Sequence, residues 1–104
     1  MYSGVLATHG DPGDTLTITG VDAAKTLAEY NISVKQANGM PAIAVLITVE
    51  GNNARFKFGD GASVGHLILV NGSYMGFGPQ VVKNLKIGNA TAGSNATIYV
   101  TVFF

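Results

Sequence analysis

Residues 42–58 read AIAVLITVEGNNARFKF, and this stretch decides the fold class of the chain. Apolar side chains fill both faces of Ala42–Glu50 up to Thr48, which predicts a strand buried on both sides. The next three residues, Gly51-Asn52-Asn53, favour a turn. Ala54–Phe58 then alternates aromatic and basic side chains, as a strand with one buried face does. We expect a hairpin whose first strand lies at the centre of a sandwich or at a boundary between subunits.

Turn-forming residues recur about every ten residues along the rest of the chain, a spacing typical of short antiparallel strands in a sandwich or barrel. Asn71-Gly72 is the pair most typical of a two-residue hairpin turn. The one expected helix is short, Asp22–Tyr30, with Asp22 as its cap. Further strands are expected at Tyr2–Thr8, Thr15–Thr19, Asn31–Gln36, His66–Val70, Ser73–Phe77, Val82–Ile87 and Ala96–Phe104.

The predicted fold is therefore all-β, a small antiparallel β-sandwich of about seven or eight short strands, with the jelly roll among the arrangements it allows. A chain of 104 residues is the length of a single domain, residues 1–104. The expected core side chains are Ile18, Val45, Ile47, Phe56, Phe58, Leu67, Leu69, Leu85, Ile87, Ile98 and Val100.

Charge is scarce in this chain. Six Lys or Arg and six Asp or Glu make 12% of its residues charged, with a net charge of zero; an average soluble domain is about 25% charged. A domain of this size hides only about 60–70% of its unfolded surface, so we expect another protein to cover part of the rest. A C-terminus ending in two phenylalanines would fray unless something held it. The predicted interface residues are Tyr99, Thr101, Phe103 and Phe104, and the predicted partner is a second copy, with a trimer as the starting assumption.

The composition argues against several functions. The chain has no cysteine, so it has no disulfide, no thiolate metal site and no thiol nucleophile. Its basic residues are scattered rather than clustered, which argues against nucleic-acid binding. The longest nonpolar run, Met40–Ile47, is too short to span a bilayer, and we predict no membrane partner. The N-terminal residues lack the pattern of a signal peptide.

Neither histidine belongs to a recognisable catalytic or metal-binding pattern. His9, Asp11 and Asp14 share one loop, but two carboxylates fall short of the six to eight oxygen ligands that calcium prefers, so a plain turn is favoured. His66 follows Ser63 without the layout of a nucleophile, a base and an orienting acid. We predict no catalytic residue, no metal and no cofactor, and therefore no enzyme.

The aromatic residues of the chain allow two ligand-binding interpretations. The aromatic and basic residues of Ala54–Phe58 point to opposite faces, so a stacked nucleobase could not meet both kinds of side chain. Tyr74 and Phe77, with Asn71 nearby, could stack on a sugar ring, and a carbohydrate-binding module is the alternative function. Tyr30 and Asp60 could add to such a site. The sequons at Asn31, Asn71, Asn89 and Asn95 are attributed to asparagine-rich turns rather than to glycosylation.

Two longer stretches carry a resemblance. The first is AVLITVEGNNARFKFGDG at residues 44–61 with ASVGHL at 62–67; the second is VKNLKI at 82–87 with AGSNATIYVTVF at 92–103. Together they resemble small all-β structural proteins encoded among the virion genes of tailed bacteriophages. The resemblance covers about residues 43–104, whereas the segment before Ile43 is interpreted from its pattern alone. It implies a non-enzymatic structural subunit of the decoration, connector or fibre-associated type, made in the host cytoplasm and located in the virion, with itself and other virion proteins as partners.

Overall fold

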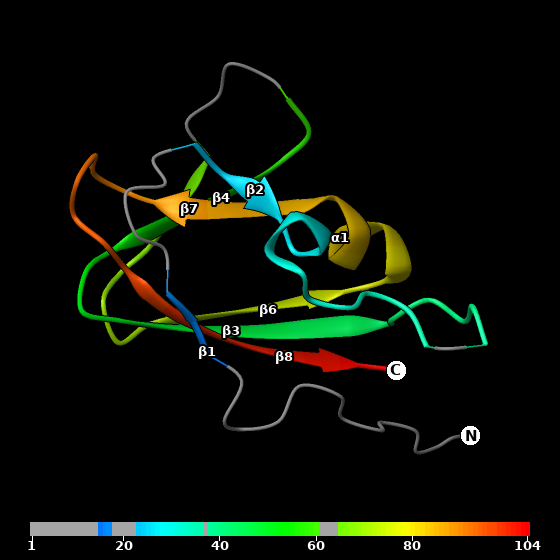
Figure 1. The fold of residues 1–104 in the computed structure, drawn as a ribbon. Helices are drawn as coiled ribbons and strands as arrows, with labels where there is room; N and C mark the ends of the chain where they lie inside the picture. The colour runs from blue at the N-terminus through cyan, green and yellow to red at the C-terminus, as the bar shows by residue number, and fades with distance from the viewer. Residues whose placement is uncertain (1–14, 18–22, 37, 61–64) are drawn as a thin grey trace.

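A computed structural model of the protein describes residues 15–17, 23–36, 38–60 and 65–104. Within these residues, eight strands form two four-stranded sheets that lie face to face (Figure 1). The helical elements are a six-residue helix, α1 (Pro79–Asn84), and a 3-10 turn, η1 (Ala28–Tyr30). The strands are β1 (Thr15–Thr17), β2 (Lys25–Thr26), β3 (Ala44–Glu50), β4 (Ala54–Phe58), β5 (His66–Ile68), β6 (Ser73–Phe77), β7 (Leu85–Asn89) and β8 (Thr97–Phe103).

The strand order is β1-β8-β3-β6 in one sheet, here called sheet A, and β2-β7-β4-β5 in the other, sheet B. All neighbouring strands are antiparallel. Among consecutive strands only β4 and β5 share a sheet; every other connection crosses from one layer to the other. Eight antiparallel strands in two sheets with this order are the arrangement of a jelly roll. The expected all-β sandwich is confirmed, and no helix among the described residues is long and apolar enough to cross a membrane.

The core lies between the two sheets and is built by alternation along each strand. β3 sends Val45, Ile47 and Val49 inward, and β8 sends Ile98, Val100 and Val102 inward to meet them in register. The residues of the cluster that lie outside the strands are Leu27, Ala42, Val82, Ala96 and Phe104. The buried side chains contributed by sheet B are those of Ala54, Phe56, Ile68, Leu85 and Ile87.

The core prediction is wrong for three residues. Each of them either lies at the end of its strand or has a side chain on the outer face of its sheet. Phe58 is the last residue of β4 and is 45% exposed. Leu67 pairs in register with Arg55 on the outer side of sheet B and is 45% exposed. Leu69 follows the end of β5 and is 60% exposed. Ile18 lies outside the described residues.

Neither expected hairpin forms, because the turns carry the chain between the sheets. β3 belongs to sheet A and β4 to sheet B, and β5 and β6 are divided in the same way. The side chain of Asn52 donates to the carbonyl of Asn95, 2.8 Å away, and Asn53 accepts a hydrogen bond from the amide of Val70 at 2.8 Å. These asparagines therefore tie the β3–β4, β5–β6 and β7–β8 connections together at one end of the sandwich.

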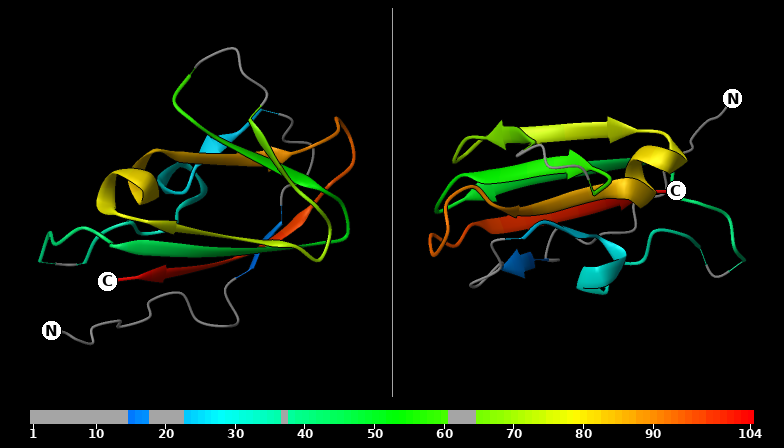
Figure 2. Two further views of the ribbon diagram at one scale, coloured as in Figure 1. Left: turned by 180° about the vertical axis from the view of Figure 1, so that it is seen from behind. Right: turned by 90° about the horizontal axis from the view of Figure 1, so that it is seen from above.

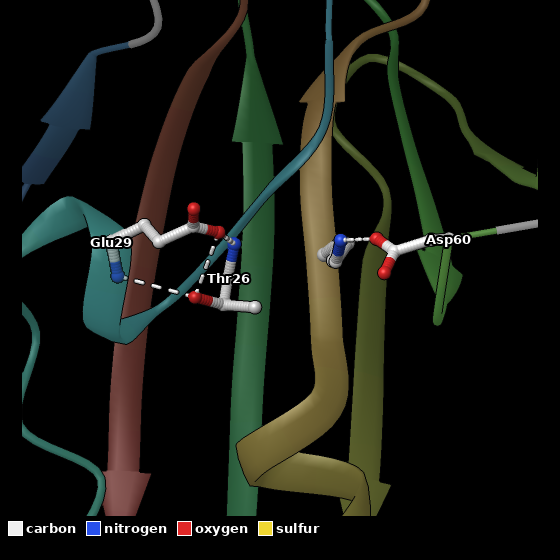
Figure 3. A network of polar contacts seen from close by, with 4 residues as sticks. Thr26, Glu29 and Asp60 are labelled. Atoms are coloured by element: carbon white, nitrogen blue, oxygen red, sulfur yellow. Dashed lines mark hydrogen bonds and ion pairs between the residues drawn. The ribbon is translucent and has the colours of Figure 1, made fainter.

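The expected helix at Asp22–Tyr30 is wrong in its described part, where β2 and η1 take its place. Thr26 and Glu29 form a reciprocal pair: the Thr26 amide donates to Glu29 Oε1 at 2.8 Å, and the Glu29 amide donates to Thr26 Oγ1 at 3.2 Å (Figure 3). This is the capping-box pattern at the start of a single helical turn.

Two further strand predictions need correction. The expected strand at Val82–Ile87 begins instead as α1, which has Pro79 in its first turn, and becomes extended only at β7. Asn31–Gln36 contains no strand, only an isolated bridge between Lys35 and Pro41. The expected C-terminal strand is confirmed as β8, which is an inner strand because it lies between β1 and β3. The expected strand at Tyr2–Thr8 lies outside the described residues.

Candidate interaction surface

The outer face of sheet A is assembled from every second residue of its three long strands. Register places Ala44 between Phe103 on one side and Phe77 on the other. The next row aligns Thr101, Leu46 and Met75 in the same way. Since directly opposite residues point to the same face of a sheet, these side chains share one surface.

We call Ala44, Leu46, Met75, Phe77 and Phe103 the apolar patch. Phe77 is 70% exposed and Met75 is 37% exposed, whereas Leu46 and Phe103 are half-buried and Ala44 is 3% exposed. The patch occupies the end of sheet A at which β3 begins and β8 and β6 finish (Figure 1). Clustered exposed apolar side chains of this kind mark an interaction surface more often than isolated ones do.

The opposite end of the same face is polar. Tyr99 and Thr48 lie opposite each other, and Glu50 is opposite Thr97. The Tyr99 hydroxyl donates to Glu50 Oε1 at 3.1 Å, and this hydrogen bond to the carboxylate raises the pKa of Tyr99. Glu50 is the one charged residue on this face among the described residues.

The outer face of sheet B has a different character. Lys57 and Lys86 are directly opposite each other there, and Arg55 lies two residues before Lys57 on the same face of β4. Lys86 forms an ion pair with Asp60 (Figure 3), which raises the pKa of the lysine and lowers that of the aspartate. The hydrogen bond from the Thr26 amide lowers the pKa of Glu29. The two outer faces of the sandwich thus differ: one carries three of the six basic residues of the chain, and the other is nearly uncharged.

The structure brings three of the four predicted interface residues together. Tyr99, Thr101 and Phe103 alternate along the outer face of β8, and each is half-buried in the single chain. Phe104 is only 9% exposed and belongs to the core cluster, so this chain itself covers the ring. Met75 and Leu46 were not predicted for the surface, although the alternation of Ser73–Phe77 and the two apolar faces of Ala42–Glu50 carried the signal.

The residues of the predicted sugar site are separated. Tyr74 points inward, where its ring stacks on Phe56 with centroids 4.1 Å apart. Phe77 is three residues along the same strand and therefore faces outward. Asn71 adopts a left-handed conformation, with φ 66°, and its amide donates to the carbonyl of Val49 at 2.7 Å. Tyr74 and Phe77 do not share a ligand face.

The accessory residues have structural contacts of their own. The Tyr30 hydroxyl donates to the carbonyl of Ile87 at 2.8 Å, and burial, together with the charge of Glu29, raises the pKa of Tyr30 to about 12. Asn89 is 6% exposed, and its Oδ1 accepts the amide of Ala96 at 3.1 Å. Asn31 ends η1 in a left-handed conformation. In the described structure, the asparagines of the four sequons thus make turn and strand-end contacts.

Candidate catalytic or metal-binding groups do not cluster in the described part of the chain. His66 begins β5, where its ring lies 5.2 Å from that of Phe56. Residues 15–17, 23–36, 38–60 and 65–104 contain no group of three or more His, Cys, Asp or Glu side chains that could hold a metal. The loop with His9, Asp11 and Asp14 lies outside them, as does Ser63.

Comparisons of the chain with protein-family models, with curated proteins and with solved structures found no match.

Proposed function

We propose that this protein is a non-enzymatic structural subunit that associates with copies of itself, and that the assembly it builds is part of a bacteriophage virion. The observation that carries the proposal is the apolar patch on sheet A. Phe77 and Met75 are exposed there in the single chain. Leu46 is directly opposite Met75, and Phe103 lies on the far side of Ala44 from Phe77. Burying such side chains between subunits stabilises an assembly by about 1.5–3 kcal/mol for each one fully removed from water.

The distribution of charge favours an identical copy as the partner. One charged side chain, Glu50, lies on the outer face of sheet A among the described residues, and it is at the polar end. A nearly uncharged surface makes no favourable ion pairs with a strongly charged partner, whereas two such surfaces can associate without electrostatic repulsion. Homodimer interfaces are also more apolar than other protein contacts. The zero net charge of the chain adds no long-range repulsion between copies.

The fold and the resemblance support the virion part of the proposal. Jelly rolls form viral capsid domains and also lectin domains, so the fold alone does not decide between a structural role and sugar binding. The separation of Tyr74 from Phe77 removes the paired aromatic platform on which the sugar-binding alternative depended. The resemblance of residues 43–104 to small virion proteins points the same way as the exposed patch.

Multi-angle light scattering on the purified protein tests this proposal. We expect a mass of at least two chains at a protein concentration on the order of tens of micromolar, increasing with concentration. Sodium sulfate should shift the equilibrium further toward the assembly, because salts of this kind strengthen apolar association. A monomeric mass at all these concentrations, with and without sulfate, would contradict self-association.

A C-terminal truncation would not be a clean test of the same interface. Removing the chain from Tyr99 onward would delete most of β8, which is an inner strand of sheet A. Val100 and Val102, both buried, would go with it. Loss of solubility after such a truncation would report the loss of the core, so point substitutions on the outer face are required.

A further inference from the structure

The edge of sheet A formed by β6 differs from the other three sheet edges. β1, β2 and β5 are the other edge strands, and within the described residues they are three, two and three residues long. β6 is five residues long and pairs continuously with β3 from Ser73 to Phe77, without a bulge. Figure 2 shows β6 at the margin of the molecule, and within the described residues no strand pairs with its outer side.

The hydrogen-bond pattern identifies the backbone groups on this free edge. The Gly78 amide donates to Ile43 and the Val49 amide donates to Gly72, which makes residues 43 and 78, and 49 and 72, the hydrogen-bonded type of pair. The two types alternate along an antiparallel ladder. Ser73, Met75 and Phe77 fall on the other type, so their N–H and C=O groups point away from β3. The same three residues carry their side chains on the outer face.

The residues of β6 carry none of the features with which a strand usually protects its own edge. Natural proteins blunt exposed edges with charged residues, proline, bulges or very short strands. Ser73–Phe77 contains neither a charge nor a proline. Residues 67–82 contain no Lys, Arg, Asp, Glu or His at all. Two of the five residues of β6 expose large apolar side chains beside the open ladder, Met75 at 37% and Phe77 at 70%.

We propose that β6 pairs with β6 of a second copy, antiparallel about a two-fold axis at Met75, so that the two A sheets become one eight-stranded sheet. This rests on the self-association proposed above and adds a contact through the sheet edge to the burial of the apolar patch on the outer face. Centring the pair on Met75 aligns all five residues and places Ser73 opposite Phe77 of the partner subunit. An uncharged strand meets its own copy without like charges facing each other, and a two-fold contact uses the same surface on both chains.

The pairing also gives the apolar patch a larger extent. In an antiparallel ladder, directly opposite side chains lie on one face. Met75 of both copies therefore meets at the axis, with Phe77 next to it on each side. The two patches become continuous across the pair. The edge contact thus orders two subunits side by side, while the outer face stays available for a further layer of contacts.

A cysteine scan along the edge tests this register, because the natural chain has no cysteine. Met75→Cys places the two thiols on the axis, where a hydrogen-bonded pair has Cα atoms about 5.5 Å apart, within the reach of a disulfide. Ser73→Cys is the matched control. In this register Ser73 is opposite the partner's Phe77, so the two introduced thiols lie four positions apart along the strand, a distance of about 13 Å. Under mild oxidation we expect about tenfold more covalent dimer from Met75→Cys than from Ser73→Cys. A mixture of Ser73→Cys and Phe77→Cys should form the mixed dimer.

The outcomes separate the edge pairing from self-association in general. The mass of the cysteine-free protein, measured by light scattering in the same buffer, is the reference. If that protein associates but Met75→Cys and Ser73→Cys cross-link equally, or neither does, the edge pairing is wrong and self-association stands. A monomeric parent refutes both. Protection of the Met75 and Phe77 amides from hydrogen exchange in a monomer would show that another segment of the same chain covers the edge.

A charge substitution provides an independent measurement. Met75→Lys would place two like charges opposite each other on the axis, and we expect it to raise the dissociation constant about tenfold or more. Thr101→Lys adds the same charge to the outer face of β8, two strands away from the edge. It should leave the edge contact unchanged. Equal effects of the two substitutions would show that association depends on the outer face alone, and would contradict the edge pairing.

Discussion

The ring of Tyr74 stacks on the ring of Phe56, with centroids 4.1 Å apart and ring planes inclined by 30°. Tyr74 belongs to β6 at the edge of sheet A, and Phe56 belongs to β4 in sheet B. The contact therefore joins the two layers beside the strand to which we assign the subunit contact. It also explains why Tyr74 cannot serve as an outward platform for a sugar.

This stacking predicts a measurable coupling between the two residues. Phe56→Ala removes an aromatic side chain that is 8% exposed and should lower the free energy of unfolding by about 3–5 kcal/mol. Tyr74→Ala should cost less, because its side chain is only half-buried. Urea unfolding of both single variants and of the double variant should give a coupling energy of about 0.5–1.5 kcal/mol. Strict additivity would show that the stacking adds no stability.

The buried amide of Asn89 predicts a second stability effect. Asn89→Ala leaves the amide of Ala96, which is fully buried, without its acceptor. An unpaired buried donor costs about 1–3 kcal/mol, and urea unfolding should show a loss of that size. Asn84→Ala is the control, because Asn84 is exposed on α1 and should change stability by less than about 0.5 kcal/mol. Equal losses in both variants would contradict the role of Asn89.

The close packing of α1 on β6 predicts that Gly76 tolerates no side chain. A Cβ at Gly76 would lie 2.8 Å from Cγ1 of Val81, a β-branched residue of α1, and 3.1 Å from the ring of Tyr74. Gly76→Ala should therefore destabilise the protein by about 1–3 kcal/mol through overpacking. Ser73→Ala, at an exposed position of the same strand, should have little effect on thermal unfolding. A stable Gly76→Ala variant would mean that α1 can move away.

The raised pKa of Tyr30 predicts a loss of stability at high pH. The pKa is about 12 in the folded chain and 10.0 without the surrounding structure, because burial disfavours the phenolate. Folding thus favours the neutral phenol: its contribution is complete below about pH 10 and is lost as the pH rises toward 12. The urea concentration at the midpoint of unfolding should therefore decrease more between about pH 9 and pH 11 for the parent protein than for Tyr30→Phe. The same drop in both would show that other groups cause it.

The strands could be predicted from the sequence where alternation is strong. Two apolar faces identify β3 as a central strand, and regular alternation identifies β8, because burial on a sheet repeats every second residue. The two connections predicted as hairpins show the limit. Gly51-Asn52-Asn53 and Asn71-Gly72 favour a turn whether the chain returns to the same sheet or crosses to the other one. The choice of sheet depends on contacts with distant residues, such as that of Asn52 with Asn95 across 43 positions.

Two local sequence signals indicated the correct helical element, but neighbouring residues favoured a different prediction. Thr26 and Glu29 have the spacing of a capping box, yet the alanines nearby suggested a longer helix. Pro79 is suited to a first helical turn, but the apolar residues after it suggested a strand. For the candidate surface, alternation places Phe77 and Met75 on one side of β6. That Leu46 and Phe103 join the same patch follows only from the pairing of β3 with β6 and β8.

The apolar patch makes one prediction that bears most directly on the proposed function. Sedimentation of the parent protein should be compared with Phe77→Asp, on the patch, and with Leu67→Asp, an exposed residue on the outer face of sheet B. We predict that Phe77→Asp raises the dissociation constant of the assembly by about tenfold or more, the size expected for a central interface residue, and that Leu67→Asp leaves it unchanged. A parent that sediments as a monomer, or an assembly that Phe77→Asp leaves intact, would contradict the account.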